Sequence, residues 1–285
     1  MQYLIILICA LLTCTKVTIQ GYLSKENIKN STDSVLANCL VFAFTFIIFS
    51  LSLRNGVDIS VLYYSVWFGV LGVSFQVFYA LALKSGPFSA SCMLINLNMV
   101  LPVIFSIIYY NEKATTTKVV GIILSLIALF LNIKSDGKKV NIKWFVYVAL
   151  AFLSTGGISI VQKIFAKSEY RGNLEQFIFL GYLIAFILSF VLFCIRQKNE
   201  QTRTFKVNRK NVFLTFLIAT ALGAFQFFNT YANSFIDAII LVPSVCGLST
   251  VFQMLAGRII FHEKFTARQI CSICVGITSI LLISL

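Results

Sequence analysis

Charged residues are scarce in this chain of 285 residues, at 12% of the total, and only 10 are acidic. A soluble globular domain carries about 25% charged residues, so the composition argues against a water-soluble enzyme. Proline is also rare, with 3 residues against 15 glycines, which excludes a collagen-like or Pro/Gly-rich fibre. A single histidine leaves little scope for acid–base or metal chemistry.

Apolar residues dominate instead, at 59% of the chain with a mean hydropathy of +0.90. Such a composition excludes intrinsic disorder and is typical of a multi-pass membrane protein. About 20 apolar residues are needed for a helix to cross a bilayer, and ten apolar runs come close to that length. They are 3–24, 35–53, 61–83, 88–110, 116–133, 144–166, 174–195, 210–233, 237–261 and 268–284. We therefore expect an all-α integral membrane protein with ten transmembrane helices.

The net charge of +13 has a membrane explanation as well. Lys and Arg gather in the loops of membrane proteins and face anionic lipid, so the partner that this charge indicates is the bilayer and not nucleic acid. The eight cysteines all lie within apolar runs and behave as small hydrophobic residues. Cys271 and Cys274 form a CxxC pair without a second pair or a neighbouring histidine, so the sequence predicts no metal site.

The second half of the chain repeats the first in the order of its polar residues. Five helices are expected in each half, near 1–136 and 137–285, and an odd number makes consecutive halves insert with opposite orientation. Inverted repeats are an architecture of secondary transporters, in which the binding site lies near the midplane. The matched positions are Thr13, Gln20 and Lys25 with Thr155, Gln162 and Lys167, then Gln76 and Ala82 with Gln226 and Ala232, and Glu112-Lys113 with Glu263-Lys264.

Several motifs resemble the drug/metabolite transporter superfamily, in particular its EamA-type members with two five-helix repeats. They are the segment YALALKSGP at 79–87, Pro102, Glu112-Lys113 followed by Gly121, and Glu263-Lys264. The resemblance covers essentially the whole chain, with one departure: Gln253 stands where Pro102 would map. It implies a ten-helix transporter of small metabolites, a group that includes carriers of amino acids, nucleotide sugars, phosphorylated sugars and drugs.

Lys16 is the most informative polar residue, because it lies near the middle of its apolar run and shares a face with Thr13 and Gln20. A charge at that depth costs at least about 2.5 kcal/mol, so we expect it to face a cavity or a partner. The alternative is that its long stem carries the ammonium group to an interface. The repeat-related residue in the second half is Ile158, so only the first half would contribute a positive charge to the site.

Other polar residues recur inside the predicted helices and indicate a polar cavity. The alternative for each amide is a hydrogen bond that locks two helices together. Pro102 and Pro243 lie inside predicted helices, where proline removes a backbone donor, and each marks either a hinge or a simple bend. The predicted cavity residues are Lys16, Gln20, Gln76, Tyr79, Asn98, Gln162, Gln226 and Asn229.

The placement of charge narrows the expected substrate. Every acidic residue lies at or near a predicted helix end or loop, and Lys163, close to a helix end, is expected to reach the interface. Small exporters of cationic drugs in this superfamily use a buried glutamate, which this chain does not offer at mid-membrane. A neutral, zwitterionic or anionic solute such as an amino acid therefore fits better, while the pattern does not reveal a coupling ion, proton or sodium.

The sequence thus predicts a secondary transporter of a small polar metabolite that works by alternating access, in the plasma membrane. The alternative is a non-transporting scaffold or regulatory membrane protein whose polar faces only join helices. No HExxH or GxSxG motif is present, His262 stands at a helix end, and neither catalysis nor a cofactor is expected. The loop charges place both termini outside, whereas the resemblance favours cytoplasmic termini, so the orientation stays open.

Overall fold

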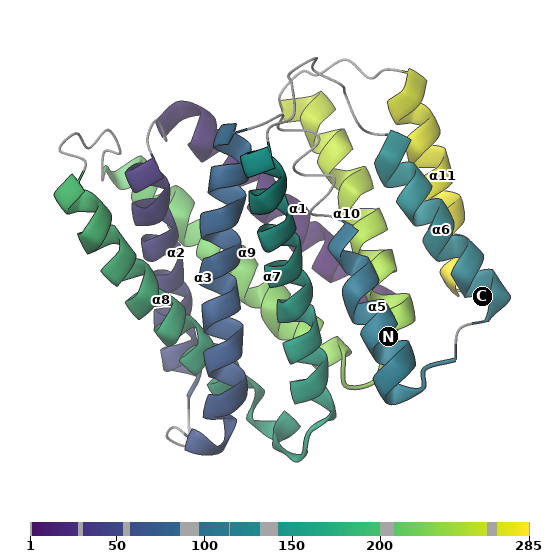
Figure 1. Cartoon of the computed structure of the whole chain (residues 1–285), viewed down its shortest axis with the longest axis horizontal. Helices are drawn as coiled ribbons and strands as arrows, with labels where there is room; N and C mark the ends of the chain where they lie inside the picture. The colour runs from purple at the N-terminus through teal and green to yellow at the C-terminus, as the bar shows by residue number, and fades with distance from the viewer. Residues whose placement is uncertain are drawn as a thin grey trace.

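The computed structural model describes residues 2–27, 31–53, 58–85, 97–113, 115–131, 142–199, 208–260 and 267–284. Within these ranges the regular secondary structure is all helical, without a strand (Figure 1). The α-helices are α1 (Gln2–Asn27), α2 (Ser31–Ser52), α3 (Leu62–Ser85), α5 (Val100–Tyr110), α6 (Thr116–Leu131), α7 (Ile142–Lys167), α8 (Leu174–Asn199), α9 (Arg209–Ala232), α10 (Ala238–Ile260) and α11 (Ala267–Ser284). Short 3-10 helices occur at Ile59–Val61, Leu97–Met99 and Glu169–Asn173.

Six of these helices, α1, α2, α3, α7, α8 and α9, are long and apolar enough to cross a membrane. Three shorter apolar helices, α5, α6 and α10, accompany them. Large apolar side chains are exposed along the middle of these helices, as expected where helices meet lipid tails: Leu153 of α7 is 55% and Ile187 of α8 51% exposed. An all-helical, multi-pass membrane protein is therefore confirmed, while ten separate crossings remain a prediction.

The fourth predicted run, 88–110, differs most from what is found. The described helix α5 begins only at Val100, directly after the 3-10 turn Leu97–Met99, and residues 86–96 lie outside the described part. Pro102 is thus the third residue of α5 and does not interrupt its interior, because the N–H groups of a first helical turn have no acceptor within the helix. Pro243, in contrast, lies inside α10 as predicted, and its role as a hinge stays a prediction.

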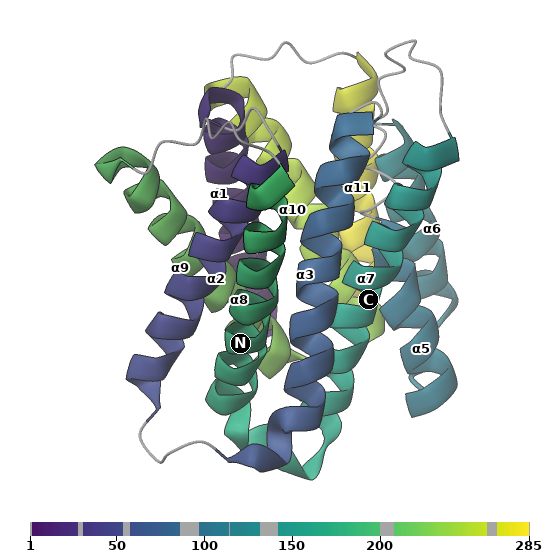
Figure 2. The same cartoon turned by 60° about the vertical axis from the view of Figure 1, so that its left-hand side comes forward.

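Equivalent helices of the two halves make equivalent contacts, when the first five α-helices are matched in order with the last five. Helix α1 packs on α9 and α10, and its counterpart α7 packs on α3 and α5. Helix α2 packs on α9, and its counterpart α8 packs on α3. The remaining large interfaces, α2 with α8 and α6 with α11, join helices that are each other's counterparts (Figures 1 and 2).

Contacts along these interfaces fix the helix directions. Tyr22, late in α1, meets Lys210 at the start of α9, while Ile6 packs with Ala232 at the end of α9, so the two helices are antiparallel. Helix α3 is likewise antiparallel to α7, since Tyr64 meets Phe165 and Ala82 packs with Trp144. The ends of α1 and α3 therefore lie at one end of the bundle, and the ends of α7 and α9 at the other.

A cluster of aromatic side chains between α2, α3, α7 and α8 forms the main core. Phe165 stacks on Phe177 at 4.2 Å between ring centroids, and Phe68 meets Phe177 edge-on at 5.2 Å. Glycines let α3 approach α8, because a Cβ atom on Gly69 would lie 2.6 Å from the carbonyl oxygen of Gly181. Close backbone contact through small residues is the usual way in which helices associate in lipid, where apolar burial supplies no driving force.

Candidate functional site

Helix α7 carries two neighbouring polar residues that point to different partners. Gln162 is 1% exposed and Lys163 is fully buried. Consecutive residues of a helix lie about 100° apart, so the two side chains serve different neighbours. Gln162 turns to α9, and Lys163 reaches the segment that joins α9 to α10.

Gln162 is the centre of an amide cluster, which we define as Gln162, Gln226, Asn229 and Thr230. Its Nε2 atom donates to Oε1 of Gln226 and to Oγ1 of Thr230, each at 2.7 Å. Its Oε1 atom accepts from Nδ2 of Asn229 at 3.2 Å. Both ends of this buried amide are thus satisfied, and the cluster joins α7 to α9.

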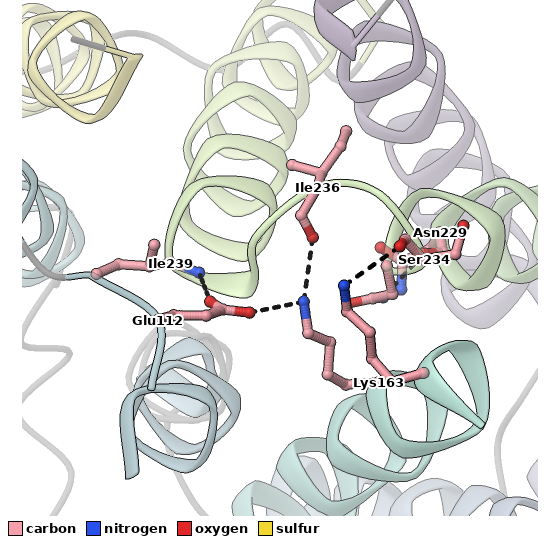
Figure 3. Close-up of polar contacts among 8 residues, drawn as sticks. Glu112, Lys163, Asn229, Ser234, Ile236 and Ile239 are labelled. Atoms are coloured by element: carbon pink, nitrogen blue, oxygen red, sulfur yellow. Dashed lines mark hydrogen bonds and ion pairs between the residues drawn. The ribbon is translucent and has the colours of Figure 1, made fainter. Parts of the chain in front are cut away.

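Lys163 forms an ion pair with Glu112 in which both side chains are buried. The distance from Nζ of Lys163 to Oε1 of Glu112 is 2.7 Å, with side chains 0% and 5% exposed. Nζ also donates to the carbonyl oxygen of Ile236 at 3.1 Å (Figure 3). Oε2 of Glu112 accepts from the backbone N–H of Ile239 at 3.2 Å, in the first turn of α10, where the helix dipole favours a negative charge.

Local backbone geometry explains why Glu112 points inward. Asn111 ends α5 in the left-handed conformation, with φ 52°. Asparagine tolerates that conformation better than most residues, and it turns the chain back so that the N–H of Glu112 donates to the carbonyl oxygen of Ser106 at 3.3 Å. The Glu112 side chain is therefore held against α7 and α10 at one end of the bundle and does not extend into solvent.

Lys167 adds a further contact at the same end, donating from Nζ to the carbonyl oxygen of Ser234 at 3.3 Å. The α9–α10 connection is thus fixed to α7 at Ser234 and Ile236 and to α5 through Glu112. We call this end of the bundle the Lys163 end, and the end where α1 and α3 finish the Gln20 end.

The predicted cavity residues fall into separate groups. Gln162, Gln226 and Asn229 meet in the amide cluster, whereas Gln20 and Gln76 are half-buried in the C-terminal halves of α1 and α3, toward the Gln20 end. Tyr79 stacks on Phe75 at 5.4 Å between ring centroids. Asn98 lies in the 3-10 turn before α5.

Lys16 is half-buried in α1 and, among the residues that the structure describes, has neither a hydrogen bond nor an ion pair. The contrast with Lys163 is direct, because that lysine has a carboxylate and a carbonyl as partners. Lys16 thus offers a cation that the described protein groups do not neutralise.

One expectation about charge is corrected, and one residue has a burial that the sequence did not indicate. Lys163 does not reach an interface, because the α9–α10 connection and the turn after α5 cover it. Glu112 stands just beyond a helix end as predicted, yet it is buried. The sequence marked Glu112-Lys113 only as a repeated motif, and nothing in the spacing linked it to Lys163, 51 positions away in another helix.

Within the described part of the chain, no three His, Cys, Asp or Glu residues lie close enough to hold a metal ion. Seven described cysteines are free, among them Cys271 and Cys274. Cys92, His262, Glu263 and Lys264 lie outside the described residues, as do Gly86 and Pro87 of the 79–87 motif.

The sequence model of the EamA-like transporter family matches this chain twice, over residues 4–134 and 142–285. The chain belongs to that family. Membership agrees with the two-repeat interpretation and indicates a membrane protein of transporter type.

One solved structure, described as "Crystal structure of protein", covers 99% of this chain and 95% of its own, with a TM-score of 0.74 and 15% identity. At that identity the likeness shows the fold alone. A search among curated proteins gives no match.

Proposed function

We propose that this EamA-like protein is a secondary transporter of a small polar metabolite, either neutral, zwitterionic or anionic, such as an amino acid. In this proposal ten helices form two inverted halves, 1–136 and 137–285, that expose a shared site to each side of the plasma membrane in turn. The observation that carries the proposal is the half-buried Lys16, a cation without a partner among the described residues.

Helix directions support the inverted arrangement. Helix α1 is antiparallel to α9 and α3 is antiparallel to α7, while α2 is antiparallel to α8, since Phe42 meets Tyr182 and Phe46 meets Phe179. Helix α2 runs parallel to α9, because Phe44 meets Phe216, and Phe49, later in α2, meets Phe227, also later in α9. Corresponding helices of the two halves therefore run in opposite directions, as inverted repeats require.

The distribution of charge supports a substrate with an anionic or neutral group. A lysine in the membrane interior faces a partner or water, because an unpaired charge in lipid is costly. Glu112, a buried carboxylate at the Lys163 end, is already neutralised by Lys163 and held by the N–H of Ile239. It therefore does not offer a free acid to a cationic solute, and a carboxylate-bearing solute at Lys16 fits the pattern better.

Counterflow of labelled metabolites in proteoliposomes tests this function, with a panel weighted to amino acids and organic anions. We expect a saturable signal for at least one carboxylate-bearing solute, reduced at least about tenfold in Lys16→Ala, which corresponds to about 1.4 kcal/mol. Lys143→Met is the matched control, because it removes a positive charge at an exposed site at the start of α7. An unchanged signal in Lys16→Ala would remove the role assigned to Lys16.

The scaffold alternative is favoured by one observation, the complete satisfaction of the Gln162 amide inside the protein. Water access separates the two functions. In a variant without the native cysteines, Gln76→Cys reacts with a water-soluble thiol reagent if it faces a transport pathway. An inert thiol there, together with silence in counterflow, would favour the scaffold.

A further inference from the structure

Repeat-related glutamines behave differently at the two ends of the molecule. Gln162 and Gln226 share a hydrogen bond of 2.7 Å. Their mates in the first half, Gln20 and Gln76, are both half-buried, and no hydrogen bond joins them. Each half thus has one such pair of glutamines. The pair at the Lys163 end is hydrogen-bonded, and the pair at the Gln20 end is not.

The helices that carry these residues show the same difference. Helix α7 meets α9 in a small interface, whereas α1 and α3 form none of that size among the described residues. The upper ends of α1 and α3 stand apart in Figure 2. The asymmetry therefore belongs to whole helix pairs and not to the rotamers of two side chains.

We propose that the two glutamine pairs close alternately, so that Gln20 and Gln76 hydrogen-bond when Gln162 and Gln226 separate. The proposal rests on the transport function above, because inverted repeats alternate by exchanging their two conformations. In the alternate state α1 and α3 adopt the packing that α7 and α9 have here. An amide suits this switch, since it both donates and accepts and pairs with an identical side chain.

The ion pair explains why the Lys163 end is the closed one. Glu112 belongs to the first half and Lys163 to the second, so their 2.7 Å contact joins the halves at that end. Gln162 corresponds to Gln20, so Lys163 corresponds to Gly21, which has no side chain to form such a pair. The repeat equivalent of this ion pair therefore cannot form at position 21, and the repeat mate of Glu112, Glu263, lies outside the described residues. We therefore expect closure at the Gln20 end to be the weaker of the two.

Cross-linking of cysteine pairs tests the switch without knowledge of the substrate. Gln162→Cys with Gln226→Cys, and separately Gln20→Cys with Gln76→Cys, are placed in a variant without native cysteines and treated with a short bifunctional thiol reagent. Each pair is measured with and without Glu112→Gln plus Lys163→Met, which removes both charges and leaves no unpaired buried ion. We expect the Gln162–Gln226 yield to fall at least twofold and the Gln20–Gln76 yield to rise at least twofold.

Single-cysteine variants and a Lys143→Met background control for reagent access and for loss of charge. Yields that stay unchanged, or that move in the same direction, would overturn the switch. Opposite changes in yield without any counterflow would support the switch and contradict the transport function. Counterflow with unchanged yields would support the transport function and contradict the switch. If the charge-free variant does not fold, a reducible cross-link between positions 162 and 226 replaces it, and counterflow must disappear and return on reduction.

Discussion

The two ends of this bundle are built from the same repeated residues but have different packing. At the Lys163 end, a buried ion pair and a fully bonded amide cluster tie α5, α7, α9 and α10 together. At the Gln20 end, the corresponding glutamines are not joined, and the position equivalent to Lys163 is a glycine. Among the described residues, the repeat supplies equivalent positions at both ends, and we infer that a few departures from its symmetry decide which end is tied.

Breaking the ion pair should have the largest effect on this difference. Lys163→Met alone leaves the Glu112 carboxylate buried without its partner, which we expect to cost about 3–5 kcal/mol. The double change of Lys163→Met with Glu112→Gln should recover most of that loss, because neither charge is then stranded. Thermal unfolding of the purified protein in detergent measures both, with Lys143→Met as control. A single variant as stable as the parent would contradict the burial argument.

The same substitution, glutamine to leucine, can be made at each end to compare the two. Gln162→Leu leaves Gln226, Asn229 and Thr230 without a shared partner and should destabilise the protein by about 1–2 kcal/mol. Gln20→Leu removes the repeat-related amide, which is not bonded to Gln76, and should change stability by less than about 0.5 kcal/mol. Equal losses in the same unfolding assay would show that the ends do not differ as described.

A substitution in the glycine contact between α3 and α8 tests whether a loss of general stability also changes the difference between the two ends. Gly69→Ala places a methyl group 2.6 Å from the carbonyl oxygen of Gly181, so we expect a loss of about 1–3 kcal/mol. Gly72→Ala is the matched control in the same helix, with nothing within 4 Å of the new Cβ atom. The cross-linking ratio of the two glutamine pairs should stay constant in Gly69→Ala, and a changed ratio would mean that α3–α8 packing also sets the closed end.

The smallest expected effect is the contribution of the ionised Asp58 side chain, also at the Lys163 end, to the stability of the protein. Its carboxylate accepts from the backbone N–H of Ser60 at 2.9 Å and from Nδ2 of Asn173 at 2.7 Å, and these bonds lower its pKa from the usual value. The resulting stabilisation is present above the unfolded pKa of about 3.9 and is lost as pH falls through the lower folded pKa. The unfolding temperature of the parent should therefore drop slightly more on acidification than that of Asp58→Asn, and parallel curves would contradict this contribution.

Much of the helix arrangement follows from the sequence, because hydropathy marks the apolar runs and repeated polar residues align the halves. The hydrogen bond between Gln162 and Gln226 corresponds to the alternative given for each amide, a bond that locks two helices together, while a cavity at these residues stays a prediction. The burial of Lys163 could not be predicted in this way. It depends on the turn at Asn111 and on the path of the α9–α10 connection, neither of which leaves a periodic signal in the sequence.

The most direct test of the account is the reaction rate of a water-soluble thiol reagent with single cysteines at 20, 76, 162 and 226 in membrane vesicles. We predict fast labelling at 20 and 76 and protection at 162 and 226. In a protein that also carries the Gln20→Cys–Gln76→Cys cross-link, labelling at 162 or 226 becomes fast. Equal rates at all four positions, or protection at 20 and 76 in the unmodified protein, would contradict a transporter that rests closed at its Lys163 end.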